Sequence, residues 1–423
     1  MDVPLSHIGA SGDRHDGIFR QYMTAFHRAL VLVSCLFAPM AMAEELDSTV
    51  GKALFDRKWV QAPASTNAAD GLGPLFNAQG CATCHKNGGG ARFSAIGGVL
   101  GVAGFVVRLG DNEGNPDPNL GRQLQEHAIP GLMPEARIEP HLEQGADGLS
   151  RMLAKIAFTQ EKPDPATRQE FRVAPPLLGR GLMARVAAQE ILKNADPDDR
   201  NGDGISGRAR IIATPEGSQL GRFGLKATAA SIADQTADAA MLDMGLSSPL
   251  RPFPYGDCTK AETHCLANAT GRSPELDGEE ISRQMVEMVA AYVAALKPLP
   301  AKANPEGERL LSATGCTACH MPSLKAETGE ALPVFTDLLL HDMGDGLAGA
   351  FPDGFATANE WRTAPLIDLA GRNGKRRFLH DGRAATLDEA IRWHGGEALK
   401  AKDLFMNLPK ADQVKLIDYL GSL

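Results

Sequence analysis

The feature that most constrains this chain is a pentapeptide, Cys-x-x-Cys-His, that occurs twice. The first copy runs from Cys81 to His85 within the stretch GCATCHKNGGG, and the second runs from Cys316 to His320 within GCTACHMPS. A glycine precedes each copy. One helical turn brings the two cysteines of such a motif together, with the histidine directly after them. The repeat therefore predicts two binding sites of the same kind in distant parts of the chain.

Three kinds of site use cysteines at this spacing. A redox dithiol needs no following histidine and follows a strand, which this sequence does not indicate. A zinc site normally has its ligands closer together in the sequence. A c-type haem uses all three residues, because two thioethers form to the vinyl groups and the histidine is the proximal iron ligand. We therefore predict two covalently bound c-type haems, held by four cysteines and two histidines: Cys81, Cys84, His85, Cys316, Cys319 and His320.

Composition and charge limit the class of protein. The aromatic fraction is 5%, and 45 Gly with 27 Pro indicate much loop, so a large flat cofactor would help to fill the core. The formal net charge of −9 argues against nucleic acid or an anionic membrane surface as a partner. It favours a basic protein partner instead.

The N-terminus has the pattern of an export signal. Arg28 precedes the apolar run ALVLVSCLFAPMAMA, and residues 41–43 form a small-x-small cleavage site. The run is too short to span a membrane, and no other segment is apolar enough to do so. We therefore assign residues 1–43 to an N-terminal extension and signal peptide and expect a periplasmic protein. The alternative is a lipid anchor at Cys35, in the stretch LVSC.

Two further groups of residues predict smaller features. In an oxidising compartment Cys258 and Cys265 would form one local disulfide, and the alternative is two free thiols. The acidic stretch DPDDRNGDGISG matches the start of an EF-hand loop and makes a calcium site possible, with a plain Asx-rich turn as the alternative. Position twelve of that loop is Arg210 rather than glutamate, which excludes a complete EF-hand. The candidate calcium ligands are Asp199, Asn201 and Asp203.

The periodicity of apolar residues predicts a mainly α fold with little β structure. The stretch KPLP at Lys297–Pro300 divides a first unit, 44–300, which has a long loop-rich insertion, from a second unit, 301–423. A faint repeat supports two related units, because FRVAPPLLG follows the first pentapeptide and WRTAPLIDL follows the second. Helices are expected at 47–60, 147–158, 179–192, 275–296, 386–394 and near the C-terminus.

Several segments resemble the bacterial di-haem cytochrome c peroxidase superfamily. The stretch Thr363–Ala398 is similar to the C-terminal haem module of that superfamily. The stretches LLLHDMGDGLAG, WRTAPL, DPDDRNGDGISGR and GRFGLKATAASIADQTADAAMLDMG resemble a narrower branch, the di-haem c-type oxidoreductases that are labelled thiol oxidoreductases. The resemblance covers nearly the whole mature chain. It implies two cytochrome c-like domains, the first of peroxidatic type and the second for electron transfer, but these residues give no support to a thiol substrate.

The resemblance also implies the distal ligand of the second haem. In the peroxidases this ligand lies fourteen residues after the histidine of His-Asp-Gly, which places it at His394 because that histidine is His380. The family usually has methionine there, and the methylamine-utilisation enzyme has tyrosine. A bis-His pair of His320 and His394 would have a lower potential than a His/Met pair. The competing ligands are Met343 and His341.

For the first haem, the resemblance implies an open iron face with an amide and a carboxylate over it. The matching residues are Gln125 and Glu135, and the alternative is that both face solvent in a loop. A carboxylate can take a proton from a peroxide and return it to the leaving oxygen, while an amide can hold the distal oxygen. The removable distal histidine of the peroxidases falls on Gly101, so no such ligand is expected. His127 or His141 is the alternative ligand.

These residues predict a periplasmic oxidoreductase similar to the cytochrome c peroxidases. Electrons would enter at the second haem from a small donor protein, a cytochrome c or a cupredoxin, and pass to the first haem to reduce a small-molecule oxidant such as peroxide. One alternative is a pure electron-transfer cytochrome with two six-coordinate irons. The other is a redox accessory protein in iron or copper handling.

Overall fold

A computed structural model describes residues 47–65, 69–96, 99–214, 217–300, 302–370 and 376–423. The protein is a loop-rich mixed α/β fold, 29% helix and 22% strand, so the prediction of a mainly α class was wrong. The strands are short and lie in separate pairs, which explains why no long alternating pattern marked them in the sequence. The predicted export signal, its cleavage site and Cys35 lie outside the described residues.

The described strands pair two by two instead of forming one large sheet. Only β1 and β2 pair in parallel; the other pairs are antiparallel. The pairs are β1 (Val60–Gln61) with β2 (Asp70–Leu72), β3 (Leu75–Phe76) with β7 (His127–Ala128), β4 (Arg92–Ile96) with β5 (Val99–Ala103), β6 (Phe105–Gly110) with β10 (Arg168–Val173), β8 (Ala136–Gln144) with β9 (Ser150–Phe158), β11 (Ile211–Thr214) with β12 (Gly217–Leu220), β13 (Leu324–Lys325) with β14 (Ala331–Leu332), and β15 (Leu340–Asp342) with β16 (Glu360–Arg362).

The helix expected at 147–158 is strand β9. It pairs with β8 along its whole length, from Ala136 opposite Phe158 to Gln144 opposite Ser150. The apolar residues of this stretch fit both a helical and an alternating pattern, and the sequence alone did not distinguish them. The partner strand determines the outcome, because it satisfies the backbone hydrogen-bonding groups along one edge of β9. Met152 is buried in that contact.

The described helices are mostly short. Residues 47–56 are helical, as are α2 (Cys81–Cys84), α3 (Arg180–Arg185), α4 (Ala188–Leu192), α5 (Ile232–Met244), α6 (Thr263–Leu266), α7 (Arg283–Ala295), α8 (Pro305–Ala313), α9 (Leu387–Arg392), α10 (Leu399–Met406) and α11 (Lys410–Gly421). Single 3₁₀ turns lie at Lys86–Gly88, Pro274–Leu276, Cys316–Ala318, Asp345–Leu347 and Gly396–Ala398.

Two predicted helices are shorter than the apolar pattern indicated. The stretch 179–192 breaks into α3 and α4, because Val186 pairs as an isolated bridge with Ala326. In the stretch 275–296, the helix α7 begins only after Ser282, whose side chain accepts a hydrogen bond from the amide of Met285. This side-chain cap satisfies one of the free amides at the helix start.

The helix at 47–56 and α7 pack against each other through an apolar face. Phe55 and Tyr292 lie edge to face with their ring centroids 5.1 Å apart, and Leu54 and Val289 are buried in the same cluster. Each such side chain contributes about 1.5–3 kcal/mol of stability through its burial. This packing supports the first pentapeptide, because the side chains of Cys81 and Ala82 border the same cluster.

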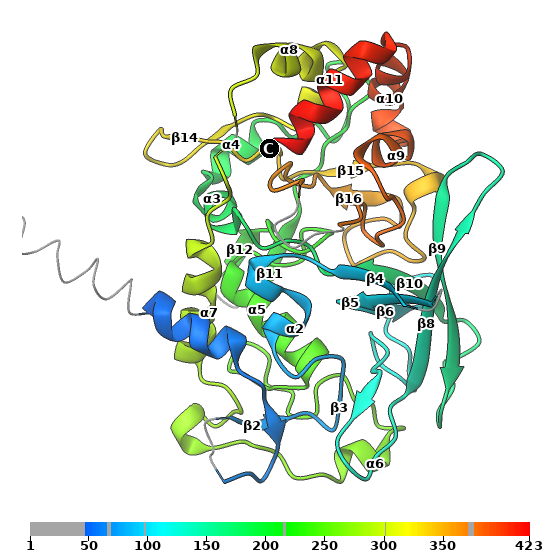
Figure 1. Ribbon diagram of the computed structural model, residues 1–423. Coiled ribbons are helices and arrows are strands. Elements are labelled where there is room, and N and C mark those ends of the chain that lie inside the picture. Colours follow the sequence, from blue (N-terminus) through cyan, green and yellow to red (C-terminus); the bar gives the residue numbers. More distant parts are fainter. Residues whose placement is uncertain (1–46, 66–68, 97–98, 215–216, 301, 371–375) are drawn as a thin grey trace, which may run out of the picture.

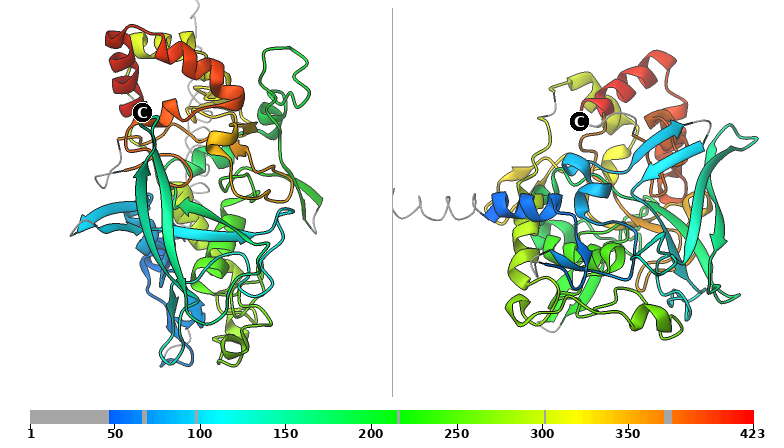
Figure 2. Two further views of the ribbon diagram at one scale, coloured as in Figure 1. Left: turned by 90° about the vertical axis from the view of Figure 1, so that its right-hand side faces the viewer. Right: turned by 60° about the horizontal axis from the view of Figure 1, so that its bottom comes forward.

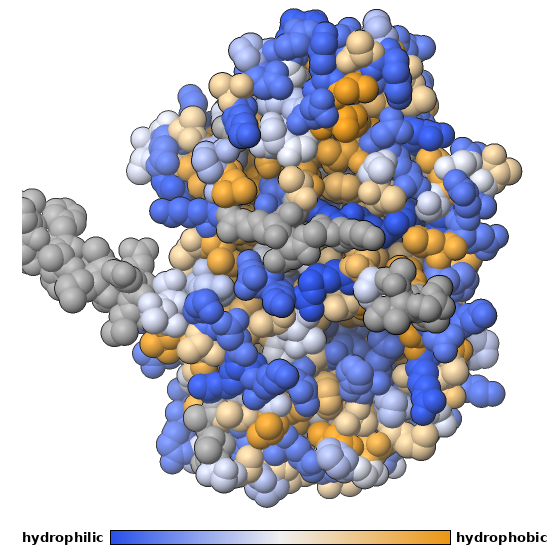
Figure 3. Space-filling model, in the orientation of Figure 1, coloured by the Kyte–Doolittle hydropathy of each residue, from blue (hydrophilic) through white to orange (hydrophobic). Residues whose placement is uncertain are grey.

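The arrangement in space separates a strand-rich flank from two helical ends (Figures 1 and 2). The long hairpin β8–β9 runs along one side of the molecule, beside β4, β5, β6 and β10. Helices α8–α11 lie together at one end, while α5 and α7 lie toward the other. On the face shown in Figure 3, hydrophobic residues gather over the region of α8–α11. None of the described helices is long and apolar enough to span a membrane. The proposed boundary at residue 300 stays a prediction.

Candidate haem sites

The first pentapeptide forms one turn of helix, α2, closed by His85. The amide of His85 donates to the carbonyl of Cys81 at 2.9 Å, and its ring Nδ1 lies 3.1 Å from the carbonyl oxygen of Gly89. Burial lowers the pKa of His85 to about 4, so the ring is neutral at physiological pH. A carbonyl at Nδ1 fixes the proton on that nitrogen and leaves Nε2 as a free electron-pair donor. This is the form of histidine that binds a metal.

The second pentapeptide repeats this arrangement with a 3₁₀ turn. Gly315 precedes it in the left-handed region, at φ 76°, which favours glycine. The ring Nδ1 of His320 lies 3.3 Å from the carbonyl oxygen of Phe335. Burial, followed by the positive charge of His394, lowers the pKa of His320 to about 4. The Nε2 atom of His320 is therefore also left as a free electron-pair donor.

His394 lies just after α9 and is held in the same way. Its ring Nδ1 lies 2.8 Å from the carbonyl oxygen of Ala390, and burial lowers its pKa. His320 and His394 line one cavity of about 340 Å³, together with Met343. The structure thus brings both predicted axial ligands of the second haem to one cavity. The choice between His394 and Met343 stays a prediction.

His341 lines the cavity but has no nitrogen available for iron. Its Nε2 lies 2.8 Å from Asp337 and its Nδ1 lies 2.7 Å from Glu397. Although burial opposes the charge, the hydrogen bonds to Asp337, Cys319 and Glu397 raise the pKa of His341 to about 12. The ring is thus an imidazolium that donates from both nitrogens. In the described part of the chain, the one close group of three possible metal ligands is Cys319, Asp337 and His341. An imidazolium cannot bind a metal, so we do not assign a zinc site there.

Three of the four pentapeptide cysteines lie in surroundings that favour the thiol over the reactive thiolate. None of them is in a disulfide. Burial raises the pKa of Cys81 and of Cys84 to about 12, and it also raises the pKa of Cys316. A redox dithiol requires a thiolate at neutral pH, so this environment disfavours that alternative.

Two buried arginines in the cavity wall fit the carboxylates of a haem. The guanidinium of Arg180 donates to the carbonyl of Pro176 at 2.8 Å and contacts the sulfur of Met183. Arg362 donates to the carbonyls of Gly224 and Thr363. Burial, followed by the charge of Arg362, lowers the pKa of Arg180 to about 9. Burial lowers the pKa of Arg362 to about 10.

In the part of the chain that the structure describes, neither of these guanidinium groups is ion-paired with a carboxylate. Two buried cations that repel each other favour the binding of an anion between them. A haem carries two propionate carboxylates and would supply such an anion. The residues present therefore fit a haem in this cavity.

Gln125 and Glu135 are buried together and do not face solvent. The backbone amide of Gln125 donates a hydrogen bond to the Oε2 of Glu135 at 2.7 Å. The side-chain nitrogen of Gln125 donates to the carbonyls of Gln123 and Leu242, whereas its Oε1 is buried without a partner. An orphaned acceptor of this kind is rare in a folded protein and is typical of a binding site.

Asp243 lies between Gln123, whose carbonyl accepts from the side chain of Gln125, and the first pentapeptide. Its carboxylate accepts a hydrogen bond from Gln123 at 2.7 Å, and its negative charge adds to the raised pKa of Cys81 and Cys84. Its backbone carbonyl accepts hydrogen bonds from the amides of Asn77 and Ala78. The position of Gln125 and Glu135 over the first haem stays a prediction.

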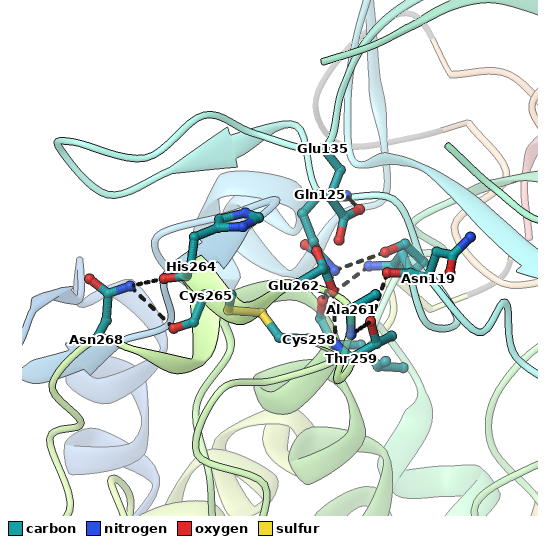
Figure 4. Close-up of a disulfide and its surroundings, with 12 residues drawn as sticks. Asn119, Gln125, Glu135, Cys258, Thr259, Ala261, Glu262, His264, Cys265 and Asn268 are labelled. Carbon is teal, nitrogen blue, oxygen red and sulfur yellow. Dashed lines mark hydrogen bonds between the residues drawn. A yellow bond between two sulfur atoms is a disulfide. The ribbon is translucent and has the colours of Figure 1, made fainter. Parts of the chain in front are cut away.

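Glu262 is a buried acid at this site that the sequence reasoning missed. It lies in the loop closed by the disulfide between Cys258 and Cys265. Its carboxyl group is in hydrogen-bonding contact with that of Glu135, and Figure 4 shows the two acids beside the disulfide. The sequence offered one signal, an acid between two cysteines, but nothing related it to Glu135.

The remaining candidate ligands of the first haem are His127 and His141. His127 is exposed in β7, with its ring 5.7 Å from that of Phe76. His141 lies in the β8–β9 hairpin opposite Leu153, and Gly101 lies in the β4–β5 hairpin opposite Ser94. His127 lines a cavity together with Thr83 of the first pentapeptide, so it stays a candidate ligand, whereas nothing brings His141 to that site.

The stretch with the predicted calcium ligands is a surface turn that is hydrogen-bonded within itself. Asp199 accepts from the amide of Gly204 at 3.2 Å, and Asn201 accepts from the amide of Asp203 at 2.9 Å. These bonds are those of an Asx-rich turn. Calcium binding stays a prediction.

Taken together, two similar sites for a metal-binding prosthetic group define a di-haem redox protein. Residues 161–423 match a family described as "Di-haem oxidoreductase, putative peroxidase", and the chain belongs to this family. None of the curated proteins matches the chain.

One solved structure, a chain of hydrazine synthase from Kuenenia stuttgartiensis, is 21% identical, with a TM-score of 0.23. The match covers 40% of this chain and 63% of that chain, so it spans less than two thirds of hydrazine synthase. This likeness is too slight to support a fold or a function.

Proposed function

We propose that this protein is a periplasmic di-haem c-type oxidoreductase that reduces peroxide or a related small oxidant at its first haem. The difference between the two sites carries this proposal. A second histidine with a free Nε2 shares the cavity of His320. The residues that the resemblance assigns to the first haem are a buried amide with an orphaned oxygen and a buried acid instead.

The cysteines of the two pentapeptides would form the thioethers, and His85 and His320 would be the proximal ligands. A bound haem supplies one-electron redox chemistry and, where an axial position is open, a place to reduce a small oxidant. At the second site His394 would close that position, leaving an iron that only transfers electrons. The first site would stay open, because the resemblance assigns an amide and an acid to it; ligation by His127, which lines a cavity with Thr83, is the alternative.

The side chains near the first haem would handle protons. Burial, followed by the charge of Glu262, raises the pKa of Glu135 well above its ordinary value, so this acid holds its proton more tightly than an exposed glutamate does. It can donate its proton to a leaving oxygen. The orphaned Oε1 of Gln125 can accept a hydrogen bond from a peroxide hydroxyl. The overall reaction balances as hydrogen peroxide, two electrons and two protons giving two water molecules.

The electrons would enter at the second haem from a small donor protein. The net charge of −9 favours a basic donor, such as a small cytochrome c or a cupredoxin. A bis-His pair has a lower potential than a His/Met pair. Bis-His ligation at the second haem would therefore increase the driving force for electron transfer from this haem to the oxidant.

Titration of the purified holoprotein with cyanide and with peroxide tests the proposal. We expect one haem to bind cyanide and to react with peroxide, while the other stays low-spin. The variant Glu135→Gln should reduce peroxide about 10²- to 10⁴-fold more slowly, because it cannot donate the proton. The matched control is Glu139→Gln, an exposed residue of strand β8, which begins directly after Glu135.

Two results would replace this function by an alternative. If both haems stay low-spin and unreactive, the protein is an electron-transfer cytochrome. If ferric or cupric ions reoxidise the reduced protein and peroxide does not, it is a redox accessory protein in metal handling.

A further inference from the structure

The disulfide loop between Cys258 and Cys265 holds a buried acid on a surface segment. Ala261 and Thr263 are exposed, whereas Glu262 between them is 1% exposed. A charged side chain is rarely buried in a surface loop without a partner. Glu262 therefore needs an explanation that its exposed neighbours do not.

The loop positions the carboxyl group of Glu262 through several independent contacts. Its Oε2 accepts from the amide of Thr259 at 2.8 Å, and the hydroxyl of Thr259 donates to the carbonyl of Asn119 at 2.7 Å. The backbone carbonyl of Glu262 accepts from the amide of Cys265, which carries the disulfide. The loop is thus fixed both to itself and to the segment that leads to Gln125 (Figure 4).

The carboxyl group of Glu262 faces that of Glu135, which is 5% exposed. Glu135 also accepts the amide of Gln125. Two adjacent buried carboxylates cannot both be ionised without a large electrostatic cost, so such a pair holds a proton between its members.

The other charged groups around the pair do not remove this constraint. The negative charge of Asp257 raises the pKa of both acids. His264, on α6, lowers the pKa of Glu262. Arg108 and Arg122 lower the pKa of Asp257. The acids of the cluster outnumber the cations that reach the pair directly, so the shared proton is retained.

We propose that Glu262 is the proton-sharing partner of Glu135 and reloads it during turnover. This inference rests on the proposed function and names a residue for its proton supply. When Glu135 donates its proton to the leaving oxygen, two carboxylates remain side by side. Glu262 then takes a proton from solvent at the surface loop and passes it to Glu135. The pair ends each cycle with one proton, as it began.

The variant Glu262→Gln in the holoprotein tests the proposal. An amide keeps an oxygen for the amide of Thr259 but carries neither the proton nor the charge. We expect peroxide reduction to slow by at least about 10-fold at neutral pH. The alkaline limb of the pH–rate profile should also move to lower pH, because the negative charge that raises the pKa of Glu135 is gone. Glu262→Asp keeps the carboxyl group, so it should recover part of the rate and move the alkaline limb back toward its wild-type position.

Glu280→Gln is the matched control for a buried acid. Glu280 is also 1% exposed, and its carboxylate accepts from the amides of Ser247 and Gly271. It has no contact with Glu135, so its variant should keep the wild-type pH–rate profile. A Glu262→Gln profile that coincides with wild type in rate and in pH dependence would overturn the proposal and leave Glu262 a structural residue.

Infrared spectroscopy separates this proposal from the proposed function. The protonated carboxyl of the pair should give a carbonyl band at neutral pH in the wild-type protein, and both Glu262→Gln and Glu135→Gln should lose it. If the wild-type protein does not reduce peroxide but shows this behaviour, the function falls and the shared proton stands. If neither variant changes the band, the shared proton is refuted whatever the activity.

Discussion

Lys226 gives the sharpest test of how the second site is held in place. Its ammonium group is fully buried and donates to three carbonyls, those of Thr357, Ala358 and Glu360, at 2.7, 3.0 and 2.9 Å. It also lies 4.2 Å from the ring centroid of Trp361. These contacts fix the segment that leads into strand β16. Trp361 in that strand stacks on His380 with centroids 4.0 Å apart, beside the cavity.

The expected effect of Lys226→Met follows from these contacts. Three hydrogen bonds from a charged donor contribute about 1.5–3 kcal/mol each, or roughly 4.5–9 kcal/mol in all. Burial opposes them by lowering the pKa of Lys226 from 10.5 to about 8, which corresponds to about 3 kcal/mol. The difference, roughly 1–6 kcal/mol, centres near 3 kcal/mol. We expect Lys226→Met to lower the free energy of unfolding by about this amount.

Urea unfolding of the holoprotein, followed by circular dichroism, measures this loss. The control is Lys52→Met, because Lys52 forms an exposed ion pair with Asp56 and its loss should leave the unfolding free energy nearly unchanged. A Lys226→Met protein as stable as wild type, or more stable, would refute the reasoning. It would mean that desolvation of the ammonium outweighs its three hydrogen bonds.

Three further predictions concern the ligand, the cavity wall and the pH dependence of stability. His394→Met should raise the midpoint potential of the second haem and add the absorption of a thioether ligand, whereas unchanged spectra would mean that His394 is not the ligand. Arg362→Gln should lower the potential of the haem in the cavity, because a buried cation that favours the reduced state is lost; exposed Arg309→Gln should not. Burial raises the pKa of Glu280 from 4.5 to about 7, so the folded state binds this proton more tightly and stability should fall as pH rises from 4.5 to 7. Glu280→Gln should flatten this dependence, and an unchanged slope in urea unfolding would contradict it.

Local features of the chain could be predicted from its sequence, because they depend on neighbouring residues. The pentapeptide turns need only the residues from Gly80 to His85 and from Gly315 to His320. The side-chain cap of α9, Thr386, likewise lies within three residues of the amide that it binds. The resemblance to a known superfamily, which the family match confirms, also rested on short motifs.

Features that depend on distant partners could not be predicted. Strand β9 was expected to be a helix, because the stretch 150–158 is ambiguous until β8 pairs with it. The mainly α class was wrong for the same reason, since each strand pair adds few residues of alternating pattern. The contact between Glu135 and Glu262 joins two loops far apart in the chain, and no local pattern marks it. The imidazolium of His341, bonded to Asp337 and Glu397, became visible only when those acids were placed.

The central claim is that the two haem sites differ on the far side of the iron. Electron paramagnetic resonance of the fully oxidised holoprotein tests it most directly. We predict one high-spin ferric haem, at Cys81–His85, and one low-spin ferric haem, whose signal changes in His394→Met. Two low-spin signals, neither of them altered in that variant, would contradict the claim.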